Sequence, residues 1–402
     1  MSNTPPAIML CLTSEFKGMP LIESCKKLGC HVILLTKEKW KHEAWPRSSI
    51  DEIFYMPDLS KRRDVINAVS YLARSRTIDR IFPLDDFDGE MAAALREHLR
   101  MPGLGETGIR FFRDKLAMRM QTRASAIEVP DFVGVLNYDR IRDFMARVAP
   151  PWILKPRGSA GAMGIKQIGS TEELWRWLDK LGDEQSDFLL EQFVAGDVFH
   201  VDSIVAEREI VFNVAHQYGR PPLAVSHGGG VFTTRTMRRD DSQTQAILDL
   251  NRQVIASLGM VRGVNHIEYI RAHADGKLYF LEAAARVGGA NIADMVEAAT
   301  GINLWHEWVR VELAHIRGEK YRLPPVQERY AGVLQCLAQQ EHPDLTAYDD
   351  PEVTWRSAKD NHAGLIVAST DPARRESLLD NYSERFARDF RAVLPPLDRP
   401  PD

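Results

Sequence analysis

Two glutamates could face each other across a predicted β-hairpin. Glu268 and Glu282 lie on either side of a turn at Ala274-Asp-Gly276. In a three-residue hairpin loop with glycine in the left-handed position, His273 would pair with Lys277, and Glu268 would then lie directly opposite Glu282. The two Cβ atoms would be about 5 Å apart, and opposed like charges destabilise a sheet. A shared cation or proton is the usual compensation, and carboxylate oxygens suit Mg²⁺. The pair therefore predicts a metal site, with exposed glutamates on an edge hairpin as the alternative.

A second feature is a lysine followed by a glycine-rich loop. An apolar run at 153–154 ends in Lys155, and Gly158–Gly164 follows, rich in Gly, Ala and Ser. Glycines let backbone N–H groups approach a ligand without Cβ clashes, and the lysine adds a compact positive charge. The segment has neither the Gly-Lys-Ser/Thr ending of a Walker A loop nor a Gly-x-Gly-x-x-Gly pattern. It predicts a polyphosphate contact, and the alternative is a structural glycine-rich hairpin.

The run Phe280–Gly289 carries charge in a small and apolar context. Glu282 and Arg286 are its charged residues, which indicates a partly buried strand. Buried charges are normally paired or bound to metal. Strand alternation places His266 and Arg286 on the face that carries the two glutamates.

The elements that must position these residues fall into three parts. Up to residue 100, short apolar strands alternate with helices, which predicts a small, doubly wound parallel sheet with its ligand crevice at the carboxyl ends of the strands. Thr13–Gly18 and Asp85-Asp86 lie at such ends, and the single glycine of the first turn disfavours a dinucleotide. The predicted strands are 7–12, 31–35, 51–55 and 80–84, and the predicted helices are 21–28, 62–73 and 89–99.

Breaks at Pro102–Gly105 and Pro324-Pro325 divide the rest of the chain. Thr107 is expected to cap a helix that runs to about Ser125. We predict an α/β (α+β) protein with domains 1–106 (Rossmann-like), 107–325 (two α+β subdomains) and 326–402 (small, α+β).

Composition excludes several classes of protein. The 402 residues carry a net charge of −5, which disfavours binding to nucleic acid or an anionic membrane. The four cysteines (Cys11, Cys25, Cys30, Cys336) have no disulfide or metal spacing, and the chain shows no signal peptide or membrane-spanning run. A cytoplasmic setting is expected.

Together these motifs resemble the ATP-grasp superfamily, in the expected order from about Thr107 to Leu323. The wording of residues 282–289, Glu-Ala-Ala-Ala-Arg-Val-Gly-Gly, is most similar to L-amino acid ligases and carnosine-synthase-like enzymes. The resemblance implies ATP and Mg²⁺ (or Mn²⁺) as cofactors. It also implies a central ATP-grasp fold, a preceding Rossmann-like domain and a closing C-terminal domain.

The resemblance also implies roles for single residues. Glu268 and Glu282 would carry the metal, Arg286 would steady the transferred phosphate and the acyl intermediate, and Lys155 would act on the phosphates. The implied ATP-binding residues are Lys115, Lys155, Gly161, Met163, Gly164, Glu191, Gln192, Phe193, Val194 and Asp197. Within them, Glu191 would accept the adenine amine, and the backbone near Phe193 and Val194 would read the ring edge.

Two departures from the family pattern bear on these roles. Many relatives have Asn two residues after the second glutamate, where this chain has Ala284, so one metal ligand is missing. Asp197 stands one position before the glutamate that often contacts ribose. Substrate contacts are predicted for His227, Gly289 and Asn291, with a surface loop and a helix cap as the alternatives.

The resemblance implies a carboxylate–amine ligase that forms an amide bond through an acyl phosphate, with amino acids or related small acids as the expected substrates. Two alternatives stay open: an ATP-grasp enzyme with another acceptor, such as bicarbonate or a thiol, and a non-catalytic ATP-binding module. Small-molecule carboxylate and amine partners, no nucleic acid, no membrane and a homodimer are the expected associations.

Overall fold

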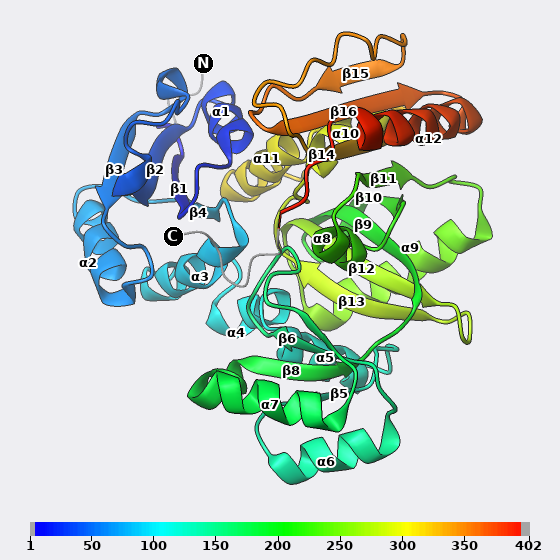
Figure 1. The fold of residues 1–402 in the computed structure, drawn as a ribbon. Coiled ribbons are helices and arrows are strands. Elements are labelled where there is room, and N and C mark those ends of the chain that lie inside the picture. Colours follow the sequence, from blue (N-terminus) through cyan, green and yellow to red (C-terminus); the bar gives the residue numbers. More distant parts are fainter. Residues whose placement is uncertain (1–4, 395–402) are drawn as a thin grey trace.

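The N-terminal part is a four-stranded parallel sheet with helices on both faces (Figure 1). The computed structural model describes residues 5–394. Alternate residues of β1 (Ile8–Thr13) and β2 (His31–Lys37) point to opposite faces, so each strand contributes to two hydrophobic cores. Helices α2 (Arg62–Ala73) and α3 (Gly89–His98) cover one face, and α1 (Met19–Lys27) covers the other. The sheet order is β3 (Glu52–Met56), β2, β1, β4 (Arg80–Pro83). The predicted doubly wound sheet is confirmed.

A second, antiparallel sheet of four strands holds the glycine-rich loop. Its order is β5 (Phe132–Gly134), β8 (Phe188–Gln192), β6 (Trp152–Pro156), β7 (Lys166–Ile168). Helices α6 (Tyr138–Arg147) and α7 (Thr171–Leu181) pack on it. The loop joins β6 to β7, which pair as an antiparallel hairpin.

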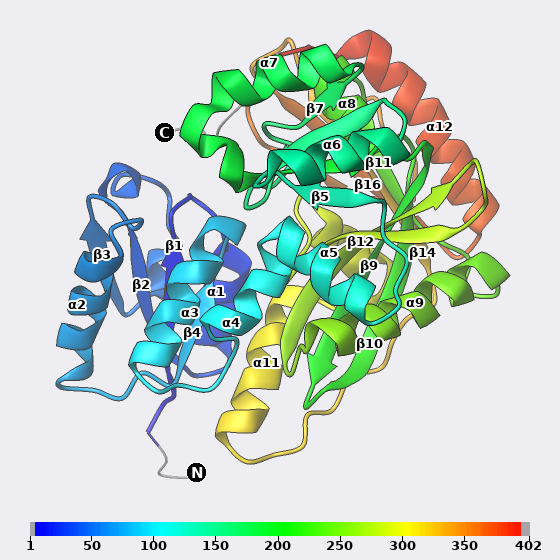
Figure 2. The same ribbon diagram turned by 90° about the horizontal axis from the view of Figure 1, so that it is seen from below.

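The third sheet has eight strands and forms the centre of the molecule (Figure 2). Its order is β13 (Leu278–Ala284), β12 (Gly263–Ala272), β9 (Gly196–Ala206), β10 (Glu209–Tyr218), β11 (Phe232–Thr236), β14 (Tyr330–Leu337), β16 (His362–Ser369), β15 (Val353–Arg356). Helices α9 (Ser242–Leu258), α10 (Ile292–Thr300), α11 (Leu304–Ile316) and α12 (Pro372–Asp389) pack against it, and α8 (Pro222–Gly228) connects β10 to β11. Since β14 pairs with β11, the strands that follow the predicted boundary at residue 325 continue the central sheet.

The predicted helix from Thr107 to Ser125 is two helices, so that prediction is wrong. A short α4 (Glu106–Ile109) passes through a 3₁₀ turn, and α5 (Lys115–Ala124) begins anew. Asp114 interrupts the helix because it is extended (φ −91°, ψ 106°) and its carboxylate accepts from the backbone N–H groups of Leu116 and Ala117. An N-cap of this kind fixes the first turn of the new helix, which is where Lys115 lies.

In the hairpin that carries the two glutamates, Glu268 pairs with Glu282 as predicted, but the loop differs from the predicted one. Ala272, not His273, donates its N–H to the carbonyl of Lys277 (2.9 Å), so the loop has four residues. A register shift between Glu268 and Tyr269 then compensates, and Glu268 pairs with Glu282. A β-bulge of this kind shifts the pairing by one residue.

Within residues 5–394, no helix combines the length and the apolar character that crossing a bilayer requires.

The cap of α5 gives a first prediction. Asp114→Ala removes the acceptor for two backbone N–H groups and the partner of the Arg157 guanidinium. We expect the free energy of unfolding to fall by about 1–2 kcal/mol, measured by urea denaturation. Asn137→Ala removes the cap of α6 alone, so its loss should be the smaller one. An Asp114→Ala protein as stable as the wild type would contradict this account of the helix start.

Candidate functional site

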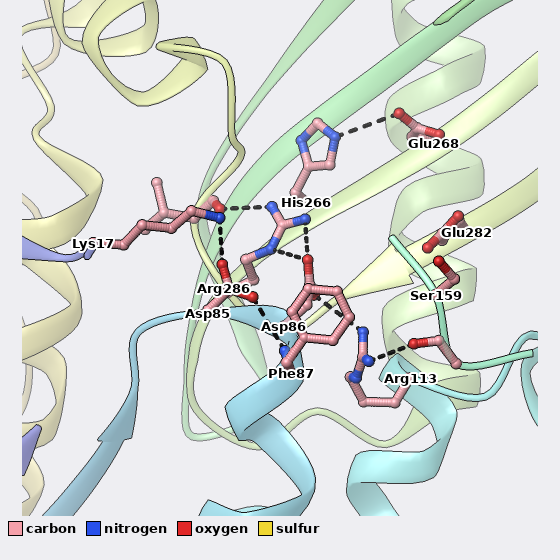
Figure 3. A network of polar contacts seen from close by, with 12 residues as sticks. Lys17, Asp85, Asp86, Phe87, Arg113, Ser159, His266, Glu268, Glu282 and Arg286 are labelled. Atoms are coloured by element: carbon pink, nitrogen blue, oxygen red, sulfur yellow. Dashed lines mark hydrogen bonds and ion pairs between the residues drawn. The ribbon is translucent and has the colours of Figure 1, made fainter. Parts of the chain in front are cut away.

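The two glutamates project from neighbouring strands (Figure 3), and the buried Lys115 lies beside them. Lys115 Nζ lies 2.9 Å from Glu282 Oε1 and donates to the carbonyl oxygen of Ser159 at 2.5 Å. The Lys115 side chain is only 5% exposed, whereas that of Glu282 is 32% exposed. One cation therefore joins the carboxylate pair to the glycine-rich loop.

The second carboxylate is held from the protein interior. Tyr218 donates its hydroxyl proton to Glu268 Oε1 at 2.7 Å, and His266 Nε2 lies 3.7 Å from the same oxygen. Burial would raise the pKa of Glu268, but His266 and Tyr218 outweigh burial and lower it to about 2. Behind His266 lies Asp202 (3.0 Å), and despite burial this carboxylate raises the pKa of His266 to about 9. Glu268 is thus held as a carboxylate.

Lys155 forms a second buried cluster with Glu191 and Arg119. Lys155 Nζ contacts Glu191 Oε2, and Arg119 Nε donates to Glu191 Oε1 at 2.5 Å. Burial lowers the pKa of Lys155 to about 8, with Glu191 opposing the shift and Arg119 adding to it. Since side chains engage both oxygens of Glu191, its expected adenine contact stays a prediction.

The glycine-rich loop is anchored at its start and turns sharply in its middle. Arg113 Nη2 donates to the carbonyl oxygen of Gly158 at 2.5 Å. Gly161, Ala162 and Gly164 have positive φ (65°, 63°, 70°), the region that glycine adopts without strain. Met163 lies between them, partly exposed.

Arg286 reaches the N-terminal sheet. Its Nε donates to Asp86 Oδ2 at 2.6 Å, and Arg113 Nη1 lies 3.6 Å from Asp86 Oδ1 (Figure 3). Burial would raise the pKa of Asp86, but the two arginines hold it below its usual value. Asp86 follows β4 at the carboxyl end of the parallel sheet, where a ligand crevice was expected. In the sequence, the position of Asp86 at the end of a predicted strand was the signal that it could reach this site.

The segment 191–194, which was expected to contact adenine, leads from the four-stranded antiparallel sheet to the central sheet. Gln192 ends β8, and Phe193 donates its N–H to the Pro151 carbonyl (3.3 Å). Within residues 5–394 the N–H of Val194 has no protein acceptor. Asp197, near the start of β9, is exposed, and its carboxylate lies 3.6 Å from His273. The backbone N–H of Val194 is thus open to a ligand.

The predicted substrate residues are only partly brought together. Gly289 and Asn291 follow Arg286 and lead into α10. Asn291 takes the N-cap position with φ 58°, but its amide donates to Asp294 (3.0 Å) rather than capping the helix. His227 falls in α8, and its side chain lies outside what the structure describes.

Two contributors were missed in the sequence. Arg119 lies four residues after Lys115, on the same face of α5, and is fully buried. Tyr218 is far from the motifs in sequence, and only the pairing of β9 with β10 and β12 brings it to Glu268. Helical spacing could have indicated Arg119, whereas no local signal indicates Tyr218.

Comparison with known proteins finds a matching domain family and several relatives. Residues 148–294 match the ATP-grasp domain family. The chain is similar to an L-arginine-specific L-amino acid ligase of Bacillus subtilis, with 27% identity over 226 residues, which cover 54% of each protein. The match thus spans about half of that relative.

Solved structures share the whole fold. An L-amino acid ligase from Bacillus licheniformis superposes with a TM-score of 0.75 at 16% identity, over 97% of this chain and 99% of that one. A carboxyaminoimidazole ribonucleotide synthase from Aspergillus clavatus, complexed with ATP, gives 0.74 at 14% identity, over 96% and 99%. The predicted ATP-grasp fold is confirmed.

Asp88, in the turn that carries Asp86, gives a pH prediction. Burial raises the pKa of Asp88 to about 7, although hydrogen bonds from Ser14 oppose the shift. An unfolded aspartate titrates near pH 4, so between about pH 4 and 7 the folded protein binds one more proton here. The stabilisation is full below the unfolded pKa and is lost as pH rises through 7. Asp88→Asn should abolish it.

The measurement is urea denaturation at pH 5 and pH 8. The stability of the wild type relative to Asp88→Asn should be greater at pH 5 than at pH 8. Asp344→Asn is the control, because the pKa of this exposed aspartate is lowered by hydrogen bonds from Thr346 and it stays ionised at both pH values. An Asp88→Asn difference that is equal at the two pH values would contradict the assignment.

Proposed function

Since this chain carries an ATP-grasp domain over residues 148–294, we propose that it is an ATP-dependent carboxylate–amine ligase. It forms an amide bond through an acyl phosphate and releases ADP and phosphate. The observation that carries the proposal is the pairing of Glu268 with Glu282 beside Lys115 and the glycine-rich loop.

The residues fit Mg²⁺ and a nucleotide. Two carboxylates held in register, one of them one-third exposed, offer the hard oxygen ligands that Mg²⁺ takes while keeping phosphate oxygens in its shell. Mn²⁺ accepts the same ligands. Ala284 has no ligand atom, so the carboxylates of Glu268 and Glu282 are the side-chain ligands we assign. The metal would neutralise part of the negative charge on the phosphates.

The cations around the pair would position the nucleotide. Lys115 and Lys155 bind phosphate oxygens, and both must exchange a present partner, the Ser159 carbonyl or Glu191, for the ligand. The loop amides from Gly161 to Gly164 cover the phosphates and exclude water. Val194 N–H and the Phe193 carbonyl read the adenine edge, and Asp197 lies where ribose would extend.

The chemistry follows in two displacements. A substrate carboxylate oxygen attacks the terminal phosphorus of ATP, the bond to the bridging oxygen breaks, and ADP leaves. An amine nitrogen then attacks the acyl carbon, phosphate departs, and the nitrogen loses a proton. Arg286 stabilises the tetrahedral oxyanion, and Asp86 holds its guanidinium in place.

The acid and the amine are proposed to be amino acids or related small molecules. Support comes from the amino acid ligase relative, and from Gly289 and Asn291 at the start of α10, where a carboxylate could meet backbone N–H groups. His227 stays a proposed contact. A homodimer, also proposed, is tested by light scattering.

The first functional prediction is a phosphate-release screen over amino-acid pairs with ATP and Mg²⁺. At least one pair should raise release above either amino acid alone, and mass spectrometry should find the dipeptide. Glu282→Gln should reduce the rate by about 10²-fold or more, and Glu319→Gln is the matched control. Bicarbonate or thiol dependence without an amine would favour the other-acceptor alternative. ATP binding with no turnover for any pair would favour a binding module.

A second prediction concerns Lys155. Lys155→Met removes a buried cation that would contact phosphate, and it leaves Glu191 paired with Arg119 alone. We expect kcat to fall about 10²–10³-fold, and we expect weaker ATP binding by isothermal titration. Lys180→Met, on α7, is the control and should keep wild-type values. Unchanged ATP affinity and kcat in Lys155→Met would remove this lysine from the site.

A further inference from the structure

A cavity of about 190 Å³ lies where the N-terminal sheet meets the central eight-stranded sheet. Residues of strand β4, helix α3, helix α11 and the start of β12 line it. Strand β4 and helix α11 lie near each other in Figure 2. At about 30 Å³ per water molecule, it has room for roughly six waters or one small organic ion.

The charges around this cavity are unbalanced. Arg80, Arg96 and Arg262 line it, and Glu312 is the acidic residue among its lining side chains. Arg80 Nε donates to Glu312 Oε2 at 2.6 Å, and Arg262 Nη1 lies 3.7 Å from the same oxygen. Arg262 also contacts Glu207, but that carboxylate is 62% exposed. Arg96 donates instead to the backbone carbonyls of Ile81 and Leu104, so Glu312 is the one lining carboxylate for three guanidinium groups.

Part of this positive charge has no protein acceptor. Arg80 is 7% exposed, and its Nη2 is buried without a hydrogen-bond partner among the described residues. A buried, unpaired donor of this kind is costly, and for a cation the missing partner is an anion. Burial also lowers the pKa of Arg96 to about 10, Glu312 opposing the shift and Arg80 adding to it.

The cavity also offers an indole donor and an apolar wall. Trp308 lines it, and its Nε1 has no hydrogen-bond acceptor among residues 5–394. Gly263 leaves space there, because a Cβ atom would lie 3.2 Å from that nitrogen. Phe82, Leu104 and Met260 give the lining an apolar part, and the Phe82 ring packs edge-on against Trp308. The lining therefore combines hydrogen-bond donors with hydrocarbon.

We propose that this cavity is a binding site for a small carboxylate anion with a short apolar body, separate from the catalytic site. The guanidinium of Arg80 pairs with the carboxylate, Trp308 donates a further hydrogen bond, and the apolar body packs on Phe82 and Met260. Inorganic phosphate fits less well, because it needs donors on all sides. An α-amino acid also fits less well, because its ammonium group would be repelled by the positive charge of the three arginines.

The bound anion joins two parts of the chain. Arg80 belongs to β4, which leads to Asp86, and the cavity also reaches Ala285, next to Arg286. Occupancy therefore stabilises the arrangement in which the N-terminal sheet contacts Arg286, and ligand binding to the folded state raises the melting temperature.

The test is calorimetric titration of the full chain with isobutyrate at constant ionic strength, with 2-aminoisobutyrate, phosphate and chloride as comparisons. Isobutyrate should bind saturably at one site, raise the melting temperature and keep its affinity when Mg²⁺ and ADP are present. Arg80→Met and Trp308→Phe should each weaken binding, Arg80→Met by about tenfold or more. Arg375→Met, another buried arginine with unpartnered nitrogens, should retain wild-type affinity.

Several results would overturn the proposal. They are an absence of saturable isobutyrate binding, tighter binding of phosphate or 2-aminoisobutyrate, and equal losses in Arg375→Met and Arg80→Met. If Arg80→Met does not fold, Trp308→Phe decides, and undiminished affinity in that variant overturns the site. Because binding is measured without turnover, failure here leaves the ligase proposal untouched, and loss of ligase activity leaves this site untouched.

Discussion

The pairing of two like charges across β12 and β13 is the constraint around which the site is arranged. Glu268 and Glu282 lie opposite each other, an arrangement that costs free energy unless cations balance it. The ammonium group of Lys115 balances the charge of Glu282. The imidazolium of His266 balances that of Glu268, to which Tyr218 also donates a hydrogen bond. These partners come from a helix start and two other positions in the central sheet, so the pair requires several distant segments to be placed together.

The same constraint explains the contacts of the glycine-rich loop. Lys115 and Arg113 both donate to loop carbonyls, at Ser159 and Gly158. Lys115, which would bind phosphate, therefore already has a neutral carbonyl partner that an incoming polyanion can replace. The exchange leaves no cation without a partner at any stage, and buried charges are tolerated only when paired.

The sequence was informative where a local pattern determined the structure. Alternating strands and helices predicted the parallel sheet, and the order of the motifs predicted the ATP-grasp fold. The carboxylate pair was predicted correctly from a wrong turn, because the loop has one residue more and a bulge shifts the register back. The helix break at Asp114 was missed because a capping side chain outweighed helical periodicity. The contacts of Tyr218 and Asp86 depend on strand order and on sheet-to-sheet packing, which spacing along the chain does not encode.

The sheet topology indicates which part can move over a substrate. Strands β14, β16 and β15 continue the central sheet through hydrogen bonds between β11 and β14. A hinge there would break a ladder of backbone hydrogen bonds, whose net worth is about 1 kcal/mol each. The four-stranded sheet with α6 and α7 shares no strand pairing with the central sheet among the described residues. Contacts of its loop with the rest, such as the Ser159 carbonyl that accepts a hydrogen bond from Lys115 on α5, are the ones that nucleotide binding would exchange. Closure is therefore expected from this small sheet and its loop, with the C-terminal strands as part of the rigid frame.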